Sequence, residues 1–174
     1  QGIDRGANRR LAGEDIEIGS TILTKGKRLR PQEIGLAASI GRKSLLVYRQ
    51  LRVALFSTGD EVLDLGDELI PGKIFDANRY SIAALLGQLG CAVHDLGILP
   101  DNNDLMRESL AVAATEHDVI ITSAGISTGE EDYIRRVVDK LGRLYFWRLA
   151  IRPGRPIALG QIDQTPFIGL PGNP

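Results

Sequence analysis

The feature that most constrains this 174-residue chain is the alternation of short apolar runs with helical patterns from Leu51 onward. Val53–Ser57 is a continuous apolar run, as expected of a strand that is covered on both faces. Further strands are expected at residues 92–99, 118–122, 143–151, 157–160 and 167–170. Helices are expected from Asn78 as N-cap, from Asp101 or Asn102, and over 133–141. This order predicts an α/β domain with a largely parallel sheet and helices on both sides; the closely spaced last strands allow an antiparallel part.

Residues 1–50 differ from the rest of the chain in composition: they are rich in glycine and arginine and contain only short apolar segments. A small hairpin or bulged strand is expected at Ser20–Lys27, a helix over Pro31–Ile40 that ends before Gly41, and a strand at Ser44–Tyr48. We therefore divide the chain into a linking segment, residues 1–50, left over from a neighbouring domain, and a main domain, residues 51–174. The main domain is expected to be truncated, because the sequence stops where a helix should begin.

Composition excludes several classes of function. The formal net charge is −1, so no overall basic field points to nucleic acid. No apolar run reaches the roughly 18 residues needed to span a bilayer, so no membrane partner is expected. Cys91 is the only cysteine, which excludes an internal disulfide or a multi-cysteine metal site and fits a cytoplasmic location.

Ligands of open α/β sheets gather beyond the carboxyl ends of the strands, so the loops there are the candidate sites. The first loop after an expected strand contains Ser57, Thr58, Gly59, Asp60 and Glu61. Its hydroxyls suit phosphate, its glycine allows close backbone approach, and its carboxylates suit a divalent cation. The alternative is a tight turn with a solvated acidic tip, and the pattern alone favours neither.

The next two loops add further acids and hydroxyls. Asp101 follows the strand at 92–99, although a helix N-cap is the simpler role for it. The loop after 118–122 precedes a helix, whose N-terminus is a ready anion site. The helix dipole favours acidic residues at a helix N-terminus, which accounts for the acids at the end of this loop but not for the residues at its start. The residues in it that we single out are Ser123, Gly125, Ser127, Gly129 and Asp132.

Of the last two loops, the first contains arginines and the second is a turn constrained by proline. Arg148 and Arg152 lie an even number of residues apart, so a regular strand would project both from one face, with Arg155 close behind. Arginine forks bind oxyanions such as phosphate or molybdate, whereas the alternative is a solvated charge row on a sheet edge. The prolines in this segment favour a ligand loop. The final turn contains Pro171, Gly172 and Asn173.

In this order, the segments VALFSTGDE, IFDANR, LGILPD, SAGISTGEEDY, FWRLAIRPGRP and GLPGNP strongly resemble the molybdopterin molybdenumtransferase family, which is related to the E domain of gephyrin. The resemblance covers nearly the whole chain, including RRLAGEDI at the front. It implies a three-layer α/β/α sandwich. It also implies transfer of molybdenum from molybdate to adenylylated molybdopterin, with magnesium assistance and release of AMP, by a cytoplasmic homodimer.

The family's functional positions fall on specific residues of this chain. The resemblance implies catalytic roles for Asp15, Glu61, Asp101, Asp132, Arg148 and Arg152. Glu61, Asp101 and Asp132 would hold Mg²⁺ against the pyrophosphate, and the arginines would bind molybdate or phosphate. The glycine and serine loops, Arg155 and the final turn would bind the pterin phosphate.

Two departures from the family pattern stand out. Arginines replace the usual lysines, and Ala124 replaces a glycine. An isolated piece of such an enzyme is expected to be inactive. The alternatives are a molybdopterin adenylyltransferase, a nicotinamide-nucleotide deamidase relative, and a gephyrin-like scaffold without catalysis. The GED segment at the front argues against the other enzymes, and the acids Glu61, Asp101 and Asp132 argue against a pure scaffold.

Overall fold

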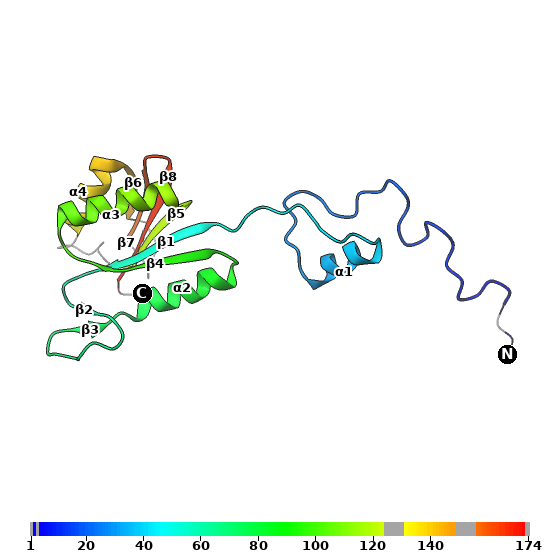
Figure 1. Cartoon of the computed structure of the whole chain (residues 1–174), viewed down its shortest axis with the longest axis horizontal. Coiled ribbons are helices and arrows are strands. Elements are labelled where there is room, and N and C mark those ends of the chain that lie inside the picture. The colour runs from blue at the N-terminus through cyan, green and yellow to red at the C-terminus, as the bar shows by residue number, and fades with distance from the viewer. Residues whose placement is uncertain (1, 3, 124–130, 149–155, 173–174) are drawn as a thin grey trace. The chain divides into compact units, whose positions relative to one another are not determined.

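The computed structural model describes residues 2, 4–123, 131–148 and 156–172, and omits the side chains of 131, 132, 146–148 and 156. The chain forms two compact units, Gln1–Tyr48 and Arg49–Pro174 (Figure 1).

The first unit contains one helix, α1 (Pro31–Ser39). Proline stands at its first position, and the Glu33 carboxylate accepts a bond from the Arg30 backbone N–H at 2.9 Å, which satisfies the start of the helix. Gly41 has a φ of +75°, as expected just past a helix end. The helix predicted from the sequence is therefore confirmed.

The prediction of strands at Ser20–Lys27 and Ser44–Tyr48 in the first unit is wrong. Around Lys25 and Gly26 the chain makes a turn, in which the Lys27 N–H donates to the Thr24 carbonyl at 3.2 Å, but the segments on either side form no ladder. Ser44–Tyr48 also lacks a β partner, and Leu46 and Tyr48 are exposed. Apolar pattern alone does not make a strand, because a strand also needs a neighbour for its backbone bonds.

The second unit is built on a six-stranded mixed sheet with the order β4-β1-β5-β8-β7-β6. Its strands are β1 (Arg52–Thr58), β4 (Ala92–Leu99), β5 (Val119–Ser123), β6 (Gly142–Arg148), β7 (Pro156–Ile162) and β8 (Thr165–Leu170). A separate two-stranded pair is formed by β2 (Val62–Leu63) and β3 (Ile74–Phe75). β4, β1, β5 and β8 are mutually parallel, whereas β7 is antiparallel to both β8 and β6. The predicted strands and the mixed sheet are thus confirmed, except for residues 149–151, which lie outside the described residues.

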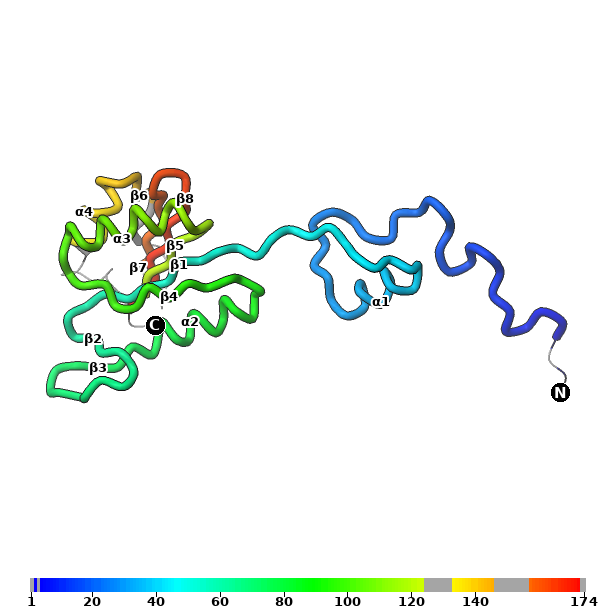
Figure 2. The backbone as a smooth tube through the Cα atoms, in the orientation of Figure 1, coloured from blue at the N-terminus to red at the C-terminus, as the bar shows by residue number. Residues whose placement is uncertain are grey.

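Helices cover both faces of this sheet. α2 (Ala77–Gln88) lies on one face, and α3 (Asn103–Glu116) and α4 (Glu131–Leu141) lie on the other (Figures 1 and 2). Phe56 of β1 packs with Met106 and Leu110 of α3 in the larger core cluster. Leu55, which points the opposite way, packs with Ile82 of α2 in the smaller one. Alternate β1 side chains therefore enter different cores, which explains why this strand is apolar throughout.

The helix starts differ in part from those expected. Asp76, not Asn78, caps α2, because its carboxylate accepts a bond from the Arg79 N–H at 3.1 Å. Asn102, not Asp101, caps α3, accepting from the N–H groups of Asp104 and Leu105. Asp101 is therefore not the helix cap, which is the role that the sequence favoured for it. Within the described parts of the chain, no helix has the length and apolar character needed to cross a bilayer.

Candidate functional site

The carboxyl ends of four parallel strands meet at one edge of the sheet, which we call the C-terminal edge. Strand register fixes this arrangement: Thr58 of β1 lies beside Leu99 of β4, and Ser57 lies beside Ser123 of β5. Ser123 in turn lies beside Leu170 of β8. The loops that follow these strands therefore leave the sheet side by side. The sequence-based expectation that separate loops share one edge agrees with this geometry.

The antiparallel strands extend the same edge. β7 begins at Pro156 on the side where β8 ends, and Arg148 at the end of β6 pairs with Pro156. The Arg148 backbone therefore also lies on the C-terminal edge. β6 is four strands from β1, and at a spacing of about 4.8 Å per strand this is about 19 Å. The backbones of the β1 loop and of Arg148 are therefore well separated along this edge, a spacing that suits an elongated ligand.

Three carboxylates are close enough to influence one another at this edge. Burial raises the pKa of Asp101, and the negative charges of Asp60 and Glu61 raise it further. The Glu61 carboxylate also folds back over Gly59, where a Cβ would meet its oxygens at 2.8 Å and 2.9 Å. Gly59 has a φ of +126°, which L-residues rarely adopt, so glycine is required at this turn. The result is a concentration of negative charge that favours a cation.

Two buried polar atoms near this edge have no hydrogen-bond partner among the described residues. They are Ser57 Oγ, on a residue that is 1% exposed, and Asn103 Oδ1. An unpaired buried polar atom is costly, so each such atom in a folded protein calls for a partner. Ser57 was among the expected binding residues. Asn103 was missed, because the first residue of a helix next to a cap carries no distinct sequence signal.

The fit of a divalent cation rests on the kind of donors present. Within the ranges that the structure describes, no three histidine, cysteine or acidic side chains are placed to form a complete metal cluster. Asp60, Glu61 and Asp101 nevertheless supply the oxygen donors that Mg²⁺ prefers. Mg²⁺ usually takes only one or two carboxylates and completes its shell with water and substrate phosphate. The described acids fit that pattern and not a closed protein cage.

The remaining predicted residues are placed as follows. Thr58 is buried at the end of β1, and Pro171 and Gly172 follow β8. Asp15 belongs to the first unit, where it is exposed and pairs with Arg10 at 3.1 Å. Asp132 and Arg148 are placed only by their backbones in α4 and β6. Gly125, Ser127, Gly129, Arg152, Arg155 and Asn173 lie outside the described residues.

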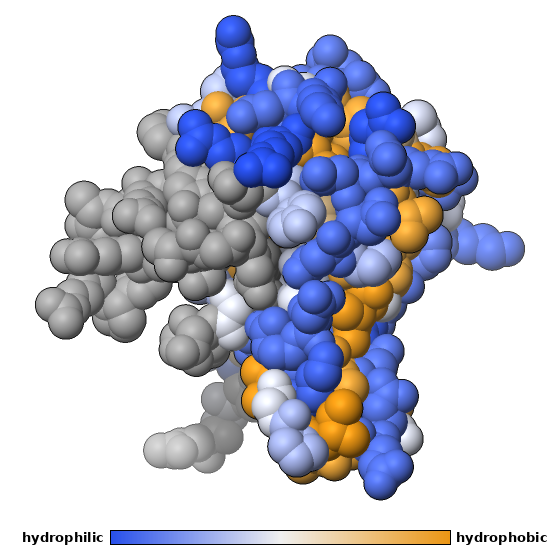
Figure 3. Space-filling view, turned by 90° about the vertical axis from the view of Figure 1, so that its left-hand side faces the viewer, coloured by the Kyte–Doolittle hydropathy of each residue, from blue (hydrophilic) through white to orange (hydrophobic). Residues whose placement is uncertain are grey.

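Viewed towards the C-terminal edge, the described surface is mostly hydrophilic, with hydrophobic residues between the polar ones (Figure 3). A second residue that was missed is Arg79. Arg79 of α2 is 2% exposed and binds three aspartates. Its motif, IFDANR, was part of the family resemblance, but nothing in the sequence indicates which distant acids it would meet.

The chain matches known families over most of its length. Residues 54–174 match the family described as "Probable molybdopterin binding domain", and residues 1–41 match "MoeA N-terminal region (domain I and II)". A curated relative from Haemophilus influenzae, molybdopterin molybdenumtransferase, is 43% identical over 96% of this chain. The chain spans only 41% of that relative's length.

Solved structures agree with this assignment. The molybdopterin biosynthesis protein MoeA from Pyrococcus horikoshii superposes with a TM-score of 0.81 at 33% identity, covering 93% of this chain and 40% of the other. The molybdopterin biosynthesis enzyme MoaB from Thermus thermophilus gives a TM-score of 0.55 at 20% identity, covering 72% of this chain and 83% of the other, which shows the fold alone. The shared six-stranded α/β fold and the match over residues 54–174 establish that the chain belongs to the family of probable molybdopterin binding domains.

Proposed function

We propose that this chain supplies the molybdopterin-binding core of an enzyme that transfers molybdenum from molybdate to adenylylated molybdopterin and releases AMP. The observation that carries the proposal is the C-terminal edge, where parallel strands deliver hydroxyl and carboxylate groups side by side. The curated relative named molybdopterin molybdenumtransferase supports the choice of reaction.

The hydroxyl-bearing strand ends suit the phosphate groups of the substrate. Ser57 and Ser123 are neighbours in the sheet and are both buried, and the Ser57 hydroxyl has no hydrogen-bond partner among the residues that the structure describes. Such a hydroxyl can donate to a phosphate oxygen that enters the edge. The loop after Ser123 leads to the start of α4, so we expect its backbone N–H groups to bind the same phosphate.

The acids suit the pyrophosphate end of the substrate. We propose that Asp101, Glu61 and Asp132 hold Mg²⁺ against the pyrophosphate, with Asp60 adding negative charge beside them. When bound, this ion would neutralise charge that develops on the departing AMP. The raised pKa of Asp101 supports this role, because a carboxylate that is costly to ionise alone gains from a cation.

The arginines suit the far end of an extended ligand. The backbone of Arg148 lies about 19 Å along the edge from β1, counted as four strand spacings. We propose that Arg148, Arg152 and Arg155 bind molybdate or a terminal phosphate there. We also propose a role for Asp15 in the reaction and that the protein works as a cytoplasmic homodimer, as the family resemblance implies.

Calorimetry with adenylylated molybdopterin, with and without Mg²⁺, tests the proposal. We expect Mg²⁺ to strengthen binding, and Asp101→Asn to remove that gain. Glu108→Gln is the matched control, because Glu108 is an exposed acid on α3. Binding that ignores both the metal and Asp101→Asn would contradict the proposal. Adenylylation of unmodified molybdopterin with ATP would instead identify an adenylyltransferase.

A further inference from the structure

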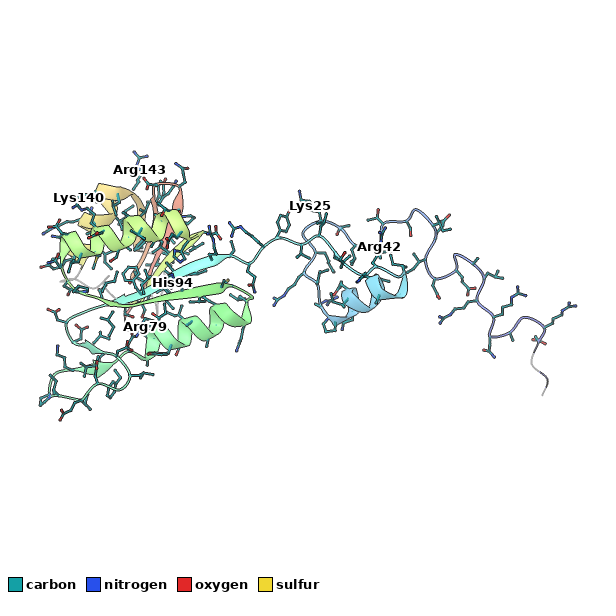
Figure 4. All side chains as sticks on the ribbon, viewed as in Figure 1. Lys25, Arg42, Arg79, His94, Lys140 and Arg143 are labelled. Atoms are coloured by element: carbon teal, nitrogen blue, oxygen red, sulfur yellow. The ribbon has the colours of Figure 1, made fainter. Side chains whose placement is uncertain are left out.

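The start of α2 contains a buried arginine with three acidic partners. Arg79 Nε binds Asp76 Oδ2 at 2.8 Å, Arg79 Nη2 binds Asp64 Oδ1 at 2.6 Å, and Arg79 Nη1 binds Asp95 (Figure 4). The guanidinium also lies over the Tyr80 ring, 4.9 Å from its centroid. Three separate segments, those that contain Asp64, Asp76 and Asp95, therefore meet at one side chain.

The cluster is held by charge. Burial lowers the pKa of Arg79, but hydrogen bonds to Asp76 and Asp95 raise it more, so the guanidinium stays charged. The side chain of Asp76 is 4% exposed, whereas those of Asp64 and Asp95 are 43% and 42% exposed. A stability role alone would need only the buried pair with Asp76. The two half-exposed acids instead lie on segments that lead to the C-terminal edge.

Asp95 links Arg79 to the segment that carries Asp101. The other oxygen of Asp95, Oδ1, accepts a bond from the Gly97 N–H at 2.8 Å. The register between β1 and β4 shifts at this point, and Gly97 has a φ of +75°. This irregularity sets the direction in which β4 continues to Leu99 and then to Asp101.

Asp64 links Arg79 to the segment that carries Glu61. Asp64 follows β2 directly, and β2 follows Glu61 directly. The β2 segment is short and pairs only with β3, so the main sheet does not hold it. The ion pair with Arg79 and the hydrogen bond from the Tyr80 hydroxyl at 2.7 Å therefore tie this segment to α2.

Asn78, the residue before Arg79, contacts a third loop. The Asn78 side-chain amide donates to the Gly172 carbonyl at 2.7 Å, which ties the start of α2 to the turn after β8. Neighbouring residues of one helical turn thus bind the segments beside Glu61, Asp101 and Pro171.

We infer that the first turn of α2 is a clamp that sets the spacing of three loops at the C-terminal edge, with Arg79 and Asn78 as positioning residues. Neither residue needs to touch the substrate. The effect on substrate binding rests on the function proposed above, whereas the effect on the loops does not.

Hydrogen–deuterium exchange on the whole chain tests the clamp. Asp95→Asn removes one charged partner of Arg79 but keeps an oxygen for Gly97. Asn78→Ala removes the bond to Gly172 while inserting the best helix former, so the helix itself should not weaken. The control is Arg49→Gln, which breaks the Arg49–Asp118 ion pair before β5, at the opposite edge of the sheet.

The expected result is local. Asp95→Asn should speed exchange about tenfold at residues 96–102, because a charge-assisted hydrogen bond is lost. Asn78→Ala should do the same at the amides of Leu170 and Gly172. Both variants should weaken binding of adenylylated molybdopterin, whereas Arg49→Gln should lower global stability without either effect.

Two outcomes would overturn the inference. One is exchange that rises evenly over the sheet, as for Arg49→Gln, and the other is exchange that does not change. If the unsubstituted chain binds no adenylylated molybdopterin, the proposed function fails, but the exchange result still decides whether the clamp exists.

Discussion

Replacing Arg79 with methionine should destabilise the second unit strongly. Methionine is unbranched and apolar, so it fills the space of the arginine stem without its charge. The substitution leaves the Asp76 carboxylate, 4% exposed, without its ionic partner. Of the three acids that bind Arg79, Asp76 alone is buried, so its cost can be separated from that of the other two.

The magnitude follows from the exposure of the three acids. Removing one member of a buried ion pair costs about 3–5 kcal/mol. Asp64 and Asp95 are more than 40% exposed and can regain water, so their lost pairs add at most about 1 kcal/mol. Asp76 keeps its bond from the backbone N–H of residue 79, which favours the lower part of the range. We therefore expect a loss of about 3–4 kcal/mol from the free energy of unfolding.

Guanidinium unfolding followed by tryptophan fluorescence measures this loss. Trp147, the only tryptophan, lies in β6 and reports on the second unit. The double variant Arg79→Met/Asp76→Ser should recover about 2 kcal/mol, since serine still caps the helix and leaves no buried charge. A loss below about 1 kcal/mol for Arg79→Met, or no recovery in the double variant, would refute the reasoning.

Three further predictions concern single sites. Asp101→Asn should stabilise the chain at pH 7, because the pKa of Asp101 is raised in the folded state and its ionised carboxylate therefore lowers the stability. The difference in melting temperature between this variant and the unsubstituted chain should vanish as pH falls below 3.8, where the carboxyl is protonated in both the folded and the unfolded state. The side-chain hydrogen bond from Arg30 lowers the pKa of Glu33 to about 2, so the contribution of Glu33 to α1 is present above pH 4.5 and is lost as pH falls towards 2. Arg30→Gln should raise the pKa of Glu33 in an NMR titration, because the backbone hydrogen bonds to Glu33 remain but the guanidinium is lost. Gly59→Ala should cost about 1–3 kcal/mol in thermal unfolding because of its φ of +126°; an unchanged melting temperature would contradict the geometry.

Local patterns predicted the frame of the second unit well. The continuous apolar run at the centre of β1 follows from burial on both faces of the sheet, which leaves a strong signal in the sequence. The edge shared by the loops also follows, because parallel strands must end on the same side. These features depend on each segment's own residues and on general rules of chain topology.

Features that depend on distant residues were not predictable. Asp76 and Asn78 are both good capping types, and only the tertiary structure assigns the cap to Asp76 and the bond to Gly172 to Asn78. Ser44–Tyr48 has the pattern of a strand but no neighbour to pair with. The partners of Arg79 come from segments up to 16 residues away, so its burial has no local signature.

Acids from separate loops are proposed to form one cation-binding site at the C-terminal edge. Paramagnetic broadening of backbone amide signals by Mn²⁺, used in place of Mg²⁺, tests this site directly. We expect selective broadening at residues 59–61, 101–103 and 131–133, with little effect at Arg52 and Asp118 on the opposite edge. Equal broadening at both edges, or broadening at only one of the three segments, would contradict it.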